Sequence, residues 1–202
     1  MNNILKFTAA SAAALAISSA SLAVAAPDAS IPEIKQIQDR GVLKVGVKNA
    51  VIGFSVEDPL TGEYKGFEDD LARLIAKDLG VDVEFTAVTA ATRTELIDSG
   101  DLDVVLATFT ISDERKTHWD FTVPYYTDYV SVLVEDKSGI KSLKDIEGKK
   151  VGVSSGSTSA RALVQAMIDN KLIEGKGFDP ATFDPHTWTE GVSFQQYDDY
   201  PA

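Results

Sequence analysis

Residues 108–126 read TFTISDERKTHWDFTVPYY, and they mark the point where an apolar run turns into a helix. The run, at residues 104–107, is short and continuous, as in a strand buried on both faces. Ser112 is a suitable N-cap, so a helix is predicted at residues 113–118. Pro124 lacks an amide donor, and the chain cannot stay helical up to it. The stretch therefore predicts a strand, a hydroxyl-rich turn and a helix in succession.

Arg115 stands in the first turn of this predicted helix, where acidic residues are favourable. A cation there faces the positive end of the helix dipole, which typically costs a few tenths to about 1 kcal/mol. A bound anion would relieve this conflict, because a guanidinium can hold a carboxylate through two parallel hydrogen bonds. The stretch is therefore a candidate carboxylate site. The sequence leaves open that Arg115 only pairs with Asp113 or Asp120 on a solvated surface.

Upstream of this stretch, predicted strands and helices alternate. The order is a strand at 41–47, an irregular hairpin-like segment at 49–66, a helix at 67–79, a strand at 81–85 and a short helix at 90–99. Such alternation indicates an α/β fold with a parallel sheet and right-handed crossovers. The acids at residues 68–70 satisfy the helix N-terminus, and we interpret them as structural rather than catalytic.

A second α/β pattern begins after the polar boundary at residues 136–139. A strand is predicted to lead into it at 127–135, followed by a brief helix at 143–146, a strand at 149–153, a helix up to about Asn170 and a strand at 192–194. The turn at residues 154–158 reads SSGST and offers backbone amides and hydroxyls to an anion. It lacks the ending of a phosphate-binding loop and the glycine spacing of a nucleophile elbow. An ordinary N-capping loop is the alternative.

The N-terminus and the composition indicate an exported protein. Residues 1–25 carry Lys6, an apolar Ala-rich run and a final AVA, so signal-peptide cleavage is predicted after Ala25, with release into the periplasm. No later apolar run reaches the roughly 20 residues needed to span a bilayer. Cysteine is absent, which excludes disulfides, thiolate metal sites and a lipid-anchored N-terminal Cys. The net charge of −12 argues against nucleic acid and anionic membranes as partners. No metal and no cofactor are predicted.

Six segments of the chain resemble the polar amino acid-binding proteins that deliver substrate to ABC importers. They are LKVGVK (43–48), GEYKGFEDDLARLIAKDLG (62–80), TRTELIDSGDLDVVLATFTISDERK (92–116), DFTVPYY (120–126), LKDIEGKKVGVSSGST (143–158) and FQQYDDYP (194–201). The ATFT and ERK segments with the upstream TR are similar to the glutamate-, aspartate- or glutamine-binding subgroup. The resemblance implies a two-lobed periplasmic-binding-protein fold, a monomer that binds its ligand without chemistry, and the membrane permease of an ABC importer as partner.

This resemblance divides the chain into five segments. They are a signal peptide at 1–25, an N-terminal linker with a helical turn at 26–39, a first lobe at 40–127, a hinge or crossing strand at 128–136 and a partial second lobe at 137–202.

The resemblance also implies roles for individual residues. Arg115 would bind the ligand α-carboxylate with Thr110 and the Thr158 amide, while Thr108 and Thr110 would face the α-ammonium. Lys48 and Arg93 would reach a side-chain carboxylate, which suggests an acidic ligand. The full predicted ligand-binding set is Lys48, Phe54, Arg93, Thr108, Phe109, Thr110, Arg115, Ser157, Thr158 and Tyr200, with Phe54 and Tyr200 as walls.

Members of this family continue past the position of Pro201, through a strand that bears the Asp pairing with the ligand ammonium, and then return to the first lobe. The present sequence ends at Ala202. We therefore expect a truncated product with an unfinished second sheet and weak or no binding on its own. Alternatives are an amino-acid sensor domain, a non-functional fragment and, least favoured, an enzyme on the same scaffold such as a dehydratase, which would need a general acid or base in the cleft.

Overall fold

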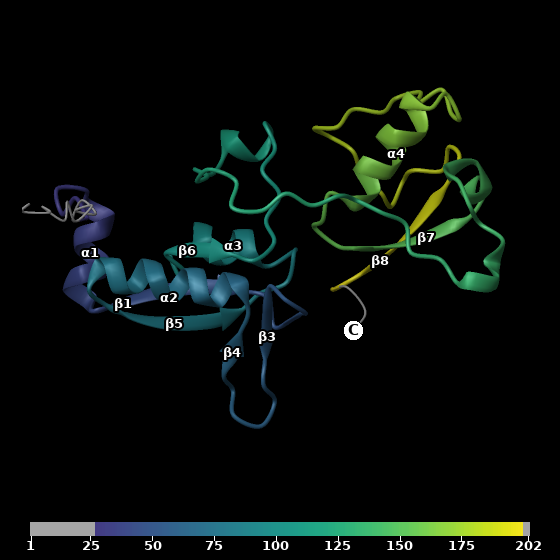
Figure 1. Cartoon of the computed structure of the whole chain (residues 1–202). Coiled ribbons are helices and arrows are strands. Elements are labelled where there is room, and N and C mark those ends of the chain that lie inside the picture. The colour runs from purple at the N-terminus through teal and green to yellow at the C-terminus, as the bar shows by residue number, and fades with distance from the viewer. Residues whose placement is uncertain (1–26, 200–202) are drawn as a thin grey trace, which may run out of the picture.

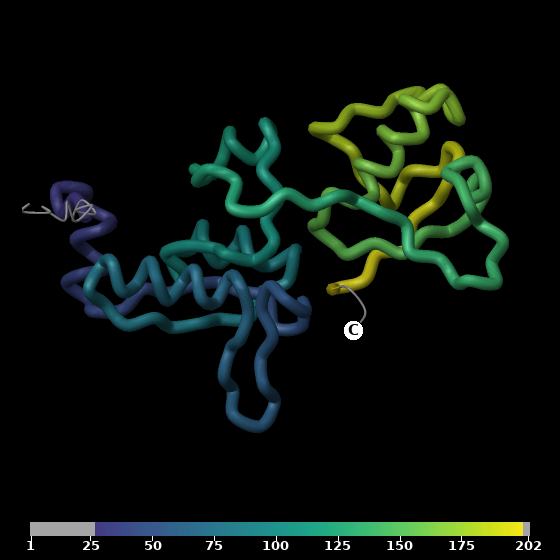
Figure 2. The backbone as a smooth tube through the Cα atoms, viewed as in Figure 1, coloured from purple at the N-terminus to yellow at the C-terminus, as the bar shows by residue number. Residues whose placement is uncertain are grey.

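The computed structural model of the protein describes residues 27–199, and these residues form two α/β lobes joined by an extended segment (Figure 1). The predicted signal peptide and Tyr200 lie outside the described residues. Figure 2 traces the chain from the first lobe along residues 127–135 into the second, where the yellow end of the chain points back toward the first lobe. We refer to the elements from α1 (Pro32–Arg40) to η1 (Arg115–Thr117) as the first lobe, and to those from η2 (Asp136–Ser138) to β8 (Ser193–Tyr197) as the second lobe.

A parallel sheet in the order β5-β1-β6 forms the centre of the first lobe, with β1 (Val42–Val47) between β5 (Asp82–Ala87) and β6 (Val104–Leu106). Leu43, Val45 and Val47 of β1 are almost completely buried, as expected of a central strand. Helix α2 (Phe67–Leu79) covers this sheet with Ala72 and Ala76, and ends at Gly80 in a left-handed conformation. The predicted strand–helix–strand order is therefore confirmed here.

Smaller elements complete the first lobe. They are α1 (Pro32–Arg40), α3 (Arg93–Asp98), the single 3₁₀ turn η1 (Arg115–Thr117), and an antiparallel sheet of β2 (Ala50–Val51), β3 (Ser55–Glu57) and β4 (Tyr64–Lys65). The small sheet occupies the predicted hairpin-like segment. Helix α1 is longer than the predicted helical turn, and its Ile37 packs against the sheet core.

The second lobe is smaller. Its elements are the 3₁₀ turns η2 (Asp136–Ser138) and η3 (Leu143–Ile146), strands β7 (Lys150–Ser154) and β8 (Ser193–Tyr197), and helix α4 (Ser159–Asp169). Strands β7 and β8 pair in parallel, and α4 packs Leu163 and Met167 into a core with Ile146 and Val192. The predicted strands and helix of this region are confirmed, with boundaries shifted by a few residues.

Two predicted elements are wrong. Residues 127–135 form no strand, because no described strand lies beside them to accept their backbone hydrogen bonds, and Leu133 in this segment is 98% exposed. The predicted helix at 113–118 is reduced to the 3₁₀ turn η1, in which the Ser112 hydroxyl accepts a hydrogen bond from the Arg115 amide at 3.2 Å. High β-propensity in the first case, and a good N-cap in the second, did not decide the outcome.

Candidate functional site

The two lobes meet where the parallel strands of both sheets end. Lys48 follows β1 directly, and Asp199 lies two residues after the end of β8. The Lys48 Nζ donates to both Asp199 carboxylate oxygens, at 2.7 and 2.6 Å. Ligands of open α/β sheets bind beyond the carboxyl ends of the strands, so this interlobe region is the candidate site.

Arg115 joins the lobes through main-chain carbonyls. Its two terminal guanidinium nitrogens donate to the carbonyl of Thr110 in the first lobe, at 2.9 Å, and to that of Gly156 in the second, at 3.1 Å. Its guanidinium also lies 4.5 Å from the centre of the Phe109 ring, a cation–π contact. Among the described residues, no acid lies within ion-pair distance of Arg115. The surface pairing with Asp113 or Asp120 that the sequence left open is therefore not observed.

A cavity of about 230 Å³ lies beside Arg115. The N-terminal end of α4 borders it, and its lining includes Glu114, Arg115, Ser154, Gly156, Ser157, Thr158, Arg161 and Gln196. Arg161 donates to the Glu114 carboxylate at 2.5 Å, which makes a second ionic contact between the lobes. Burial and the nearby Arg161 charge lower the pKa of Arg115. Two guanidiniums, one carboxylate and a helix N-terminus leave the cavity with an excess of positive charge, which suits an anionic group.

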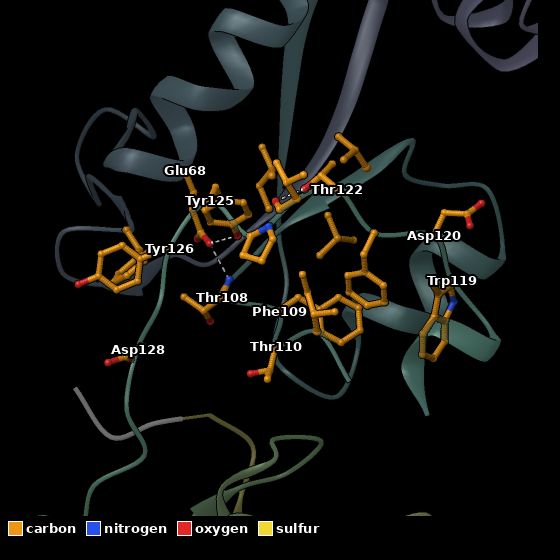
Figure 3. A pocket seen from close by; sticks show the side chains of 18 of the residues that line it. Glu68, Thr108, Phe109, Thr110, Trp119, Asp120, Thr122, Tyr125, Tyr126 and Asp128 are labelled. Carbon is orange, nitrogen blue, oxygen red and sulfur yellow. Dashed lines mark hydrogen bonds between the residues drawn. The ribbon is translucent and has the colours of Figure 1, made fainter. Parts of the chain in front are cut away.

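A larger cavity of about 470 Å³ lies in the first lobe, alongside β6 and residues 119–128 (Figure 3). Phe54, Thr108, Phe109 and Thr110 all line it. Phe54 packs edge-on against Tyr126, with ring centres 5.0 Å apart. The wall is mainly aromatic and aliphatic, and Glu68 is the buried carboxylate in it.

Glu68 fixes the backbone where β6 ends. One carboxylate oxygen accepts hydrogen bonds from the Thr108 amide and the Tyr125 hydroxyl, both at 2.7 Å (Figure 3). Thr108 has a φ of 48°, a left-handed conformation that is uncommon for a residue with a branched side chain. Burial raises the pKa of Glu68, and the two hydrogen bonds partly oppose that rise. Glu68 thus stabilises a strained turn beside the candidate site.

The other two predicted cations are occupied by the protein itself. Lys48 is 1% exposed and paired with Asp199, so it does not present a free charge to a ligand. Arg93 is buried and donates to the carbonyls of Ala107, at 2.7 Å, and Thr108, at 3.3 Å. Its guanidinium lies 4.1 Å from the centre of the Phe109 ring, which therefore contacts both Arg93 and Arg115.

The structure thus divides the predicted site residues among three places. Phe54, Thr108, Phe109 and Thr110 line the larger cavity; Arg115, Ser157 and Thr158 line the smaller one; Lys48 and Arg93 line neither. Tyr200 is outside the described residues. Arg115 connects the two cavities. It lines the smaller cavity and donates to the carbonyl of Thr110, which lines the larger cavity.

The sequence-based prediction missed Glu68, Arg161 and Asp199. Glu68 was assigned to the helix dipole alone, and nothing in the sequence distinguished it from its acidic neighbours. Arg161 pairs with a residue 47 positions away, and such a long-range pair has no local signal. Asp199 did have a local signal, because it comes shortly after a strand. An acid in that position can meet a cation at the end of another strand.

Between residues 27 and 199, no group of three or more His, Asp or Glu side chains is arranged to hold a metal ion. No helix in this range has the length and apolar character needed to cross a membrane.

The fold and the interlobe site define a two-lobed α/β binding protein of the periplasmic-binding type. Residues 43–176 match the family model of the bacterial extracellular solute-binding proteins, family 3. The chain belongs to this family.

Relatives of known assignment bind different amino acids. The chain is 35% identical over 146 residues to the ABC transporter glutamine-binding protein GlnH of Bacillus subtilis (strain 168), which covers 70% of this chain and 54% of that protein. It is 34% identical over 149 residues to a glutamine-binding protein of Geobacillus stearothermophilus, covering 72% and 57%. It is 33% identical over 153 residues to the L-cystine-binding protein TcyJ of Escherichia coli (strain K12), covering 75% and 54%. The chain therefore spans about half the length of these curated relatives.

Solved structures agree on the fold. The crystal structure of the ancestral amino acid-binding protein AncCDT-1, a precursor of cyclohexadienyl dehydratase, matches with a TM-score of 0.62 and 31% identity, over 82% of this chain and 65% of that one. An ancestral arginine-binding protein bound to arginine matches with a TM-score of 0.57 and 33% identity, over 80% and 62%.

Proposed function

We propose that this protein captures a polar L-amino acid between its two lobes and passes it to an ABC importer. Arg115 carries the proposal. It is a half-buried guanidinium that already spans both lobes and borders a cavity with excess positive charge. In this proposal the ligand α-carboxylate replaces the two carbonyl contacts of Arg115 by a charge-assisted bidentate pair, with amides at the N-terminal end of α4 as further donors.

Relatives support the class of ligand without fixing the individual amino acid. Glutamine, cystine, and glutamate or aspartate appear in their names. From the sequence we retain glutamate, aspartate and glutamine as candidates, and Thr108 and Thr110 as neighbours of the α-ammonium. We also propose export to the periplasm and a membrane permease as partner, as for relatives whose names include an ABC transporter.

The proposed activity is binding without chemistry on the ligand. Glu68 is the buried acid with a raised pKa beside a cavity, the property expected of a catalytic acid. However, one of its oxygens already holds the Thr108 amide and the Tyr125 hydroxyl, which is a structural task. We therefore expect NMR spectra of a bound amino acid to show the unchanged compound after prolonged incubation.

A site-specific titration tests the proposal. Amino acids are added up to millimolar concentration, because weak binding is expected, and backbone amide shifts of Gly156 and Thr158 are followed by NMR. Arg115→Lys keeps the charge but loses the planar fork, so we expect affinity to fall by about tenfold to a hundredfold. Lys116→Met is the matched control, because Lys116 is an exposed neighbour that pairs with Asp113.

Two results would overturn the proposal. One is the absence of saturable shifts with all twenty amino acids. The other is equal binding by a ligand that lacks the α-carboxylate, such as the amine analogue of glutamine, because the proposed role of Arg115 requires that group.

A further inference from the structure

The segment that joins the two lobes, residues 127–135, carries an inference about self-association. We propose that two copies of this protein pair through this segment, as antiparallel neighbouring strands related by a two-fold axis at Ser131. The inference is independent of amino acid binding, and it departs from the monomer that the family resemblance implies. It depends on the unpaired backbone of the segment, on its exposed apolar side chains and on the positions of its two acids.

The backbone of this segment is unpaired in its central part. Within the described range 27–199, no backbone N–H or C=O group of residues 130–134 takes part in a hydrogen bond, and no sheet includes residues 127–135. The Tyr129 amide donates to the neighbouring Asp128 side chain, at 2.7 Å. Figure 2 shows the segment as a single extended length of chain between the lobes. Such a row of unpaired groups is a template for another strand.

The side chains of the segment are suited to pairing with a strand as well. All residues from 127 to 133 are exposed, and the exposed fraction reaches 84% for Tyr129 and 98% for Leu133. Val130 and Val132 are 56% and 37% exposed. Along an extended chain, Tyr129 and Leu133 share one face and the two valines share the other. Aromatic and β-branched side chains of this kind pack well across neighbouring strands.

These features select an extended strand as the partner. A helix satisfies its own backbone groups, so it cannot pair with those of residues 130–134. The net charge of −12 disfavours an anionic membrane surface. A second copy of the chain supplies a strand with the same unpaired backbone and the same apolar side chains. In a two-fold dimer a surface meets its own copy, so the segment has to be complementary to itself.

The two acids of the segment decide how it pairs with its own copy. Asp128 and Glu135 flank six uncharged residues. A parallel pair in register would place each acid beside its own copy, and like charges opposite one another are destabilising. An antiparallel pair with its axis between Ser131 and Val132 would place Asp128 opposite Glu135, which has the same cost. An axis at Ser131 separates the acids.

With the axis at Ser131, each acid is opposite an uncharged residue. The opposed pairs are Thr127 with Glu135, Asp128 with Val134, Tyr129 with Leu133, and Val130 with Val132. Each pair occurs twice, because the two copies are equivalent. This register therefore buries the aromatic and aliphatic side chains against one another without bringing charges of the same sign together.

A charge swap at Ser131 tests the pairing and its register. Sedimentation of the protein is measured from micromolar to millimolar concentration, where we expect a monomer–dimer equilibrium. Ser131→Lys and Ser131→Glu each bring two like charges opposite one another, so each variant alone should dimerise at least about fivefold more weakly. An equimolar mixture should recover dimerisation, because lysine then faces glutamate. Ser131 is exposed, so both variants should fold, and circular dichroism checks this.

Single cysteines provide a second measurement of the register. The protein contains no cysteine, so each variant carries one thiol. Under mild oxidation Ser131→Cys should form a disulfide-linked dimer, because the two copies of this position are opposite one another. Leu60→Cys is the matched control, since Leu60 is 94% exposed in the loop between β3 and β4 and lies outside the proposed interface. Equal crosslinking of the two variants would overturn the proposed register.

Hydrogen exchange identifies what covers the segment. Amides of residues 130–134 should exchange rapidly where the protein is a monomer and become protected in the dimer. Protection already present in the monomer would overturn the proposal, because another part of the same chain would then cover the segment. The proposal is also overturned by a protein that stays monomeric at millimolar concentration, by growth into larger oligomers, or by a dimer that neither Ser131 charge variant weakens.

Discussion

The two lobes contribute to the candidate site in different ways. In the first lobe, the end of β6 is held by a buried network in which Glu68 bonds the Thr108 amide and the Tyr125 hydroxyl. In the second lobe, the corresponding part is the loop at residues 154–158, which follows a sheet with two strands within the described range 27–199. The first lobe therefore carries a preformed half-site. The second lobe contributes a loop whose position depends on its contact with the first lobe.

That contact is close at one point. A Cβ atom added to Gly156, whose φ is 73°, would lie 2.6 Å from the carbonyl oxygen of Ala90 in the first lobe. The second lobe can thus approach only because this position has no side chain. The comparison predicts that damage to the first half-site lowers stability, and that damage to the second alters how the lobes meet.

The largest expected effect comes from the first lobe. Glu68→Ala removes a fully buried carboxylate and leaves the Thr108 amide and the Tyr125 hydroxyl without their acceptor. Each buried group left unpaired typically costs about 1–3 kcal/mol, so we expect a loss of about 3 kcal/mol or more in the free energy of unfolding. Urea denaturation followed by circular dichroism measures it.

Asp70→Asn is the matched control for this substitution. Asp70 lies on the same helix turn, but its side chain is 76% exposed and pairs only with Arg73 at the surface. Its replacement should change the free energy of unfolding by less than about 0.5 kcal/mol. Equal effects of the two substitutions would mean that the first half-site is not preformed by Glu68.

The next effect concerns the approach of the second lobe. Gly156→Ala introduces a clash with the Ala90 carbonyl and a left-handed backbone strain of about 1 kcal/mol. We expect the lobes to separate, which small-angle X-ray scattering detects as a larger radius of gyration, and we expect weaker amino acid binding. Secondary structure within each lobe should remain.

Gly148→Ala is the control that separates the effect of backbone strain from the effect of the steric clash. Gly148 has a nearly equal φ of 74°, but a Cβ there would meet no atom within 4 Å. This variant should lose a similar amount of stability from strain while its scattering profile stays that of the wild type. A profile altered as much as in Gly156→Ala would show that the interlobe contact at Ala90 is not what matters.

The sequence predicted the regular parts of both lobes because those parts depend on local patterns. Helix α2 matches its predicted range of residues 67–79, since apolar spacing, first-turn acids and Gly80 all agree. The strand at 127–135 failed although its composition is strongly β-prone, because pairing depends on a neighbouring strand that the local sequence cannot reveal. Three of the residues that the resemblance implied, Arg115, Ser157 and Thr158, line one cavity, and their binding role stays a prediction. It did not reveal that Lys48 is paired, because its partner lies 151 positions away.

The buried acid of the first half-site also predicts a pH dependence. Burial raises the pKa of Glu68 above its ordinary value of 4.5, so folding favours the protonated carboxyl. Its contribution to stability is therefore full below that ordinary value and is lost as the pH rises through the raised one. Glu68→Gln does not titrate there, so the stability of the wild type relative to this variant should fall as the pH rises above 4.5 and through the raised pKa of Glu68.

Comparison with Glu68→Gln isolates one group from its neighbour. Asp69 also has a pKa raised by burial, but it is present in both proteins, and its direct contribution largely cancels in the difference. Chemical denaturation at several pH values provides the measurement. A stability difference that stays constant or grows with pH would contradict the assignment of a raised pKa to Glu68.

The smallest expected effect is that of the more exposed ionic contact between the lobes. Glu114→Gln breaks the pair with Arg161, whose partners have side-chain exposures of 43% and 21%. Pairs of this kind contribute about 1 kcal/mol or less, and salt screens them, so lobe closure should weaken by no more than about fivefold. Scattering at low and high salt can measure this shift, because the wild type should approach the variant as salt increases.

If Glu114→Gln separated the lobes as completely as Gly156→Ala, exposed charge rather than close backbone contact would hold the second half-site in place. The expected order, with the clash larger than the lost ion pair, follows from the screening of surface charges and the hardness of atomic contacts.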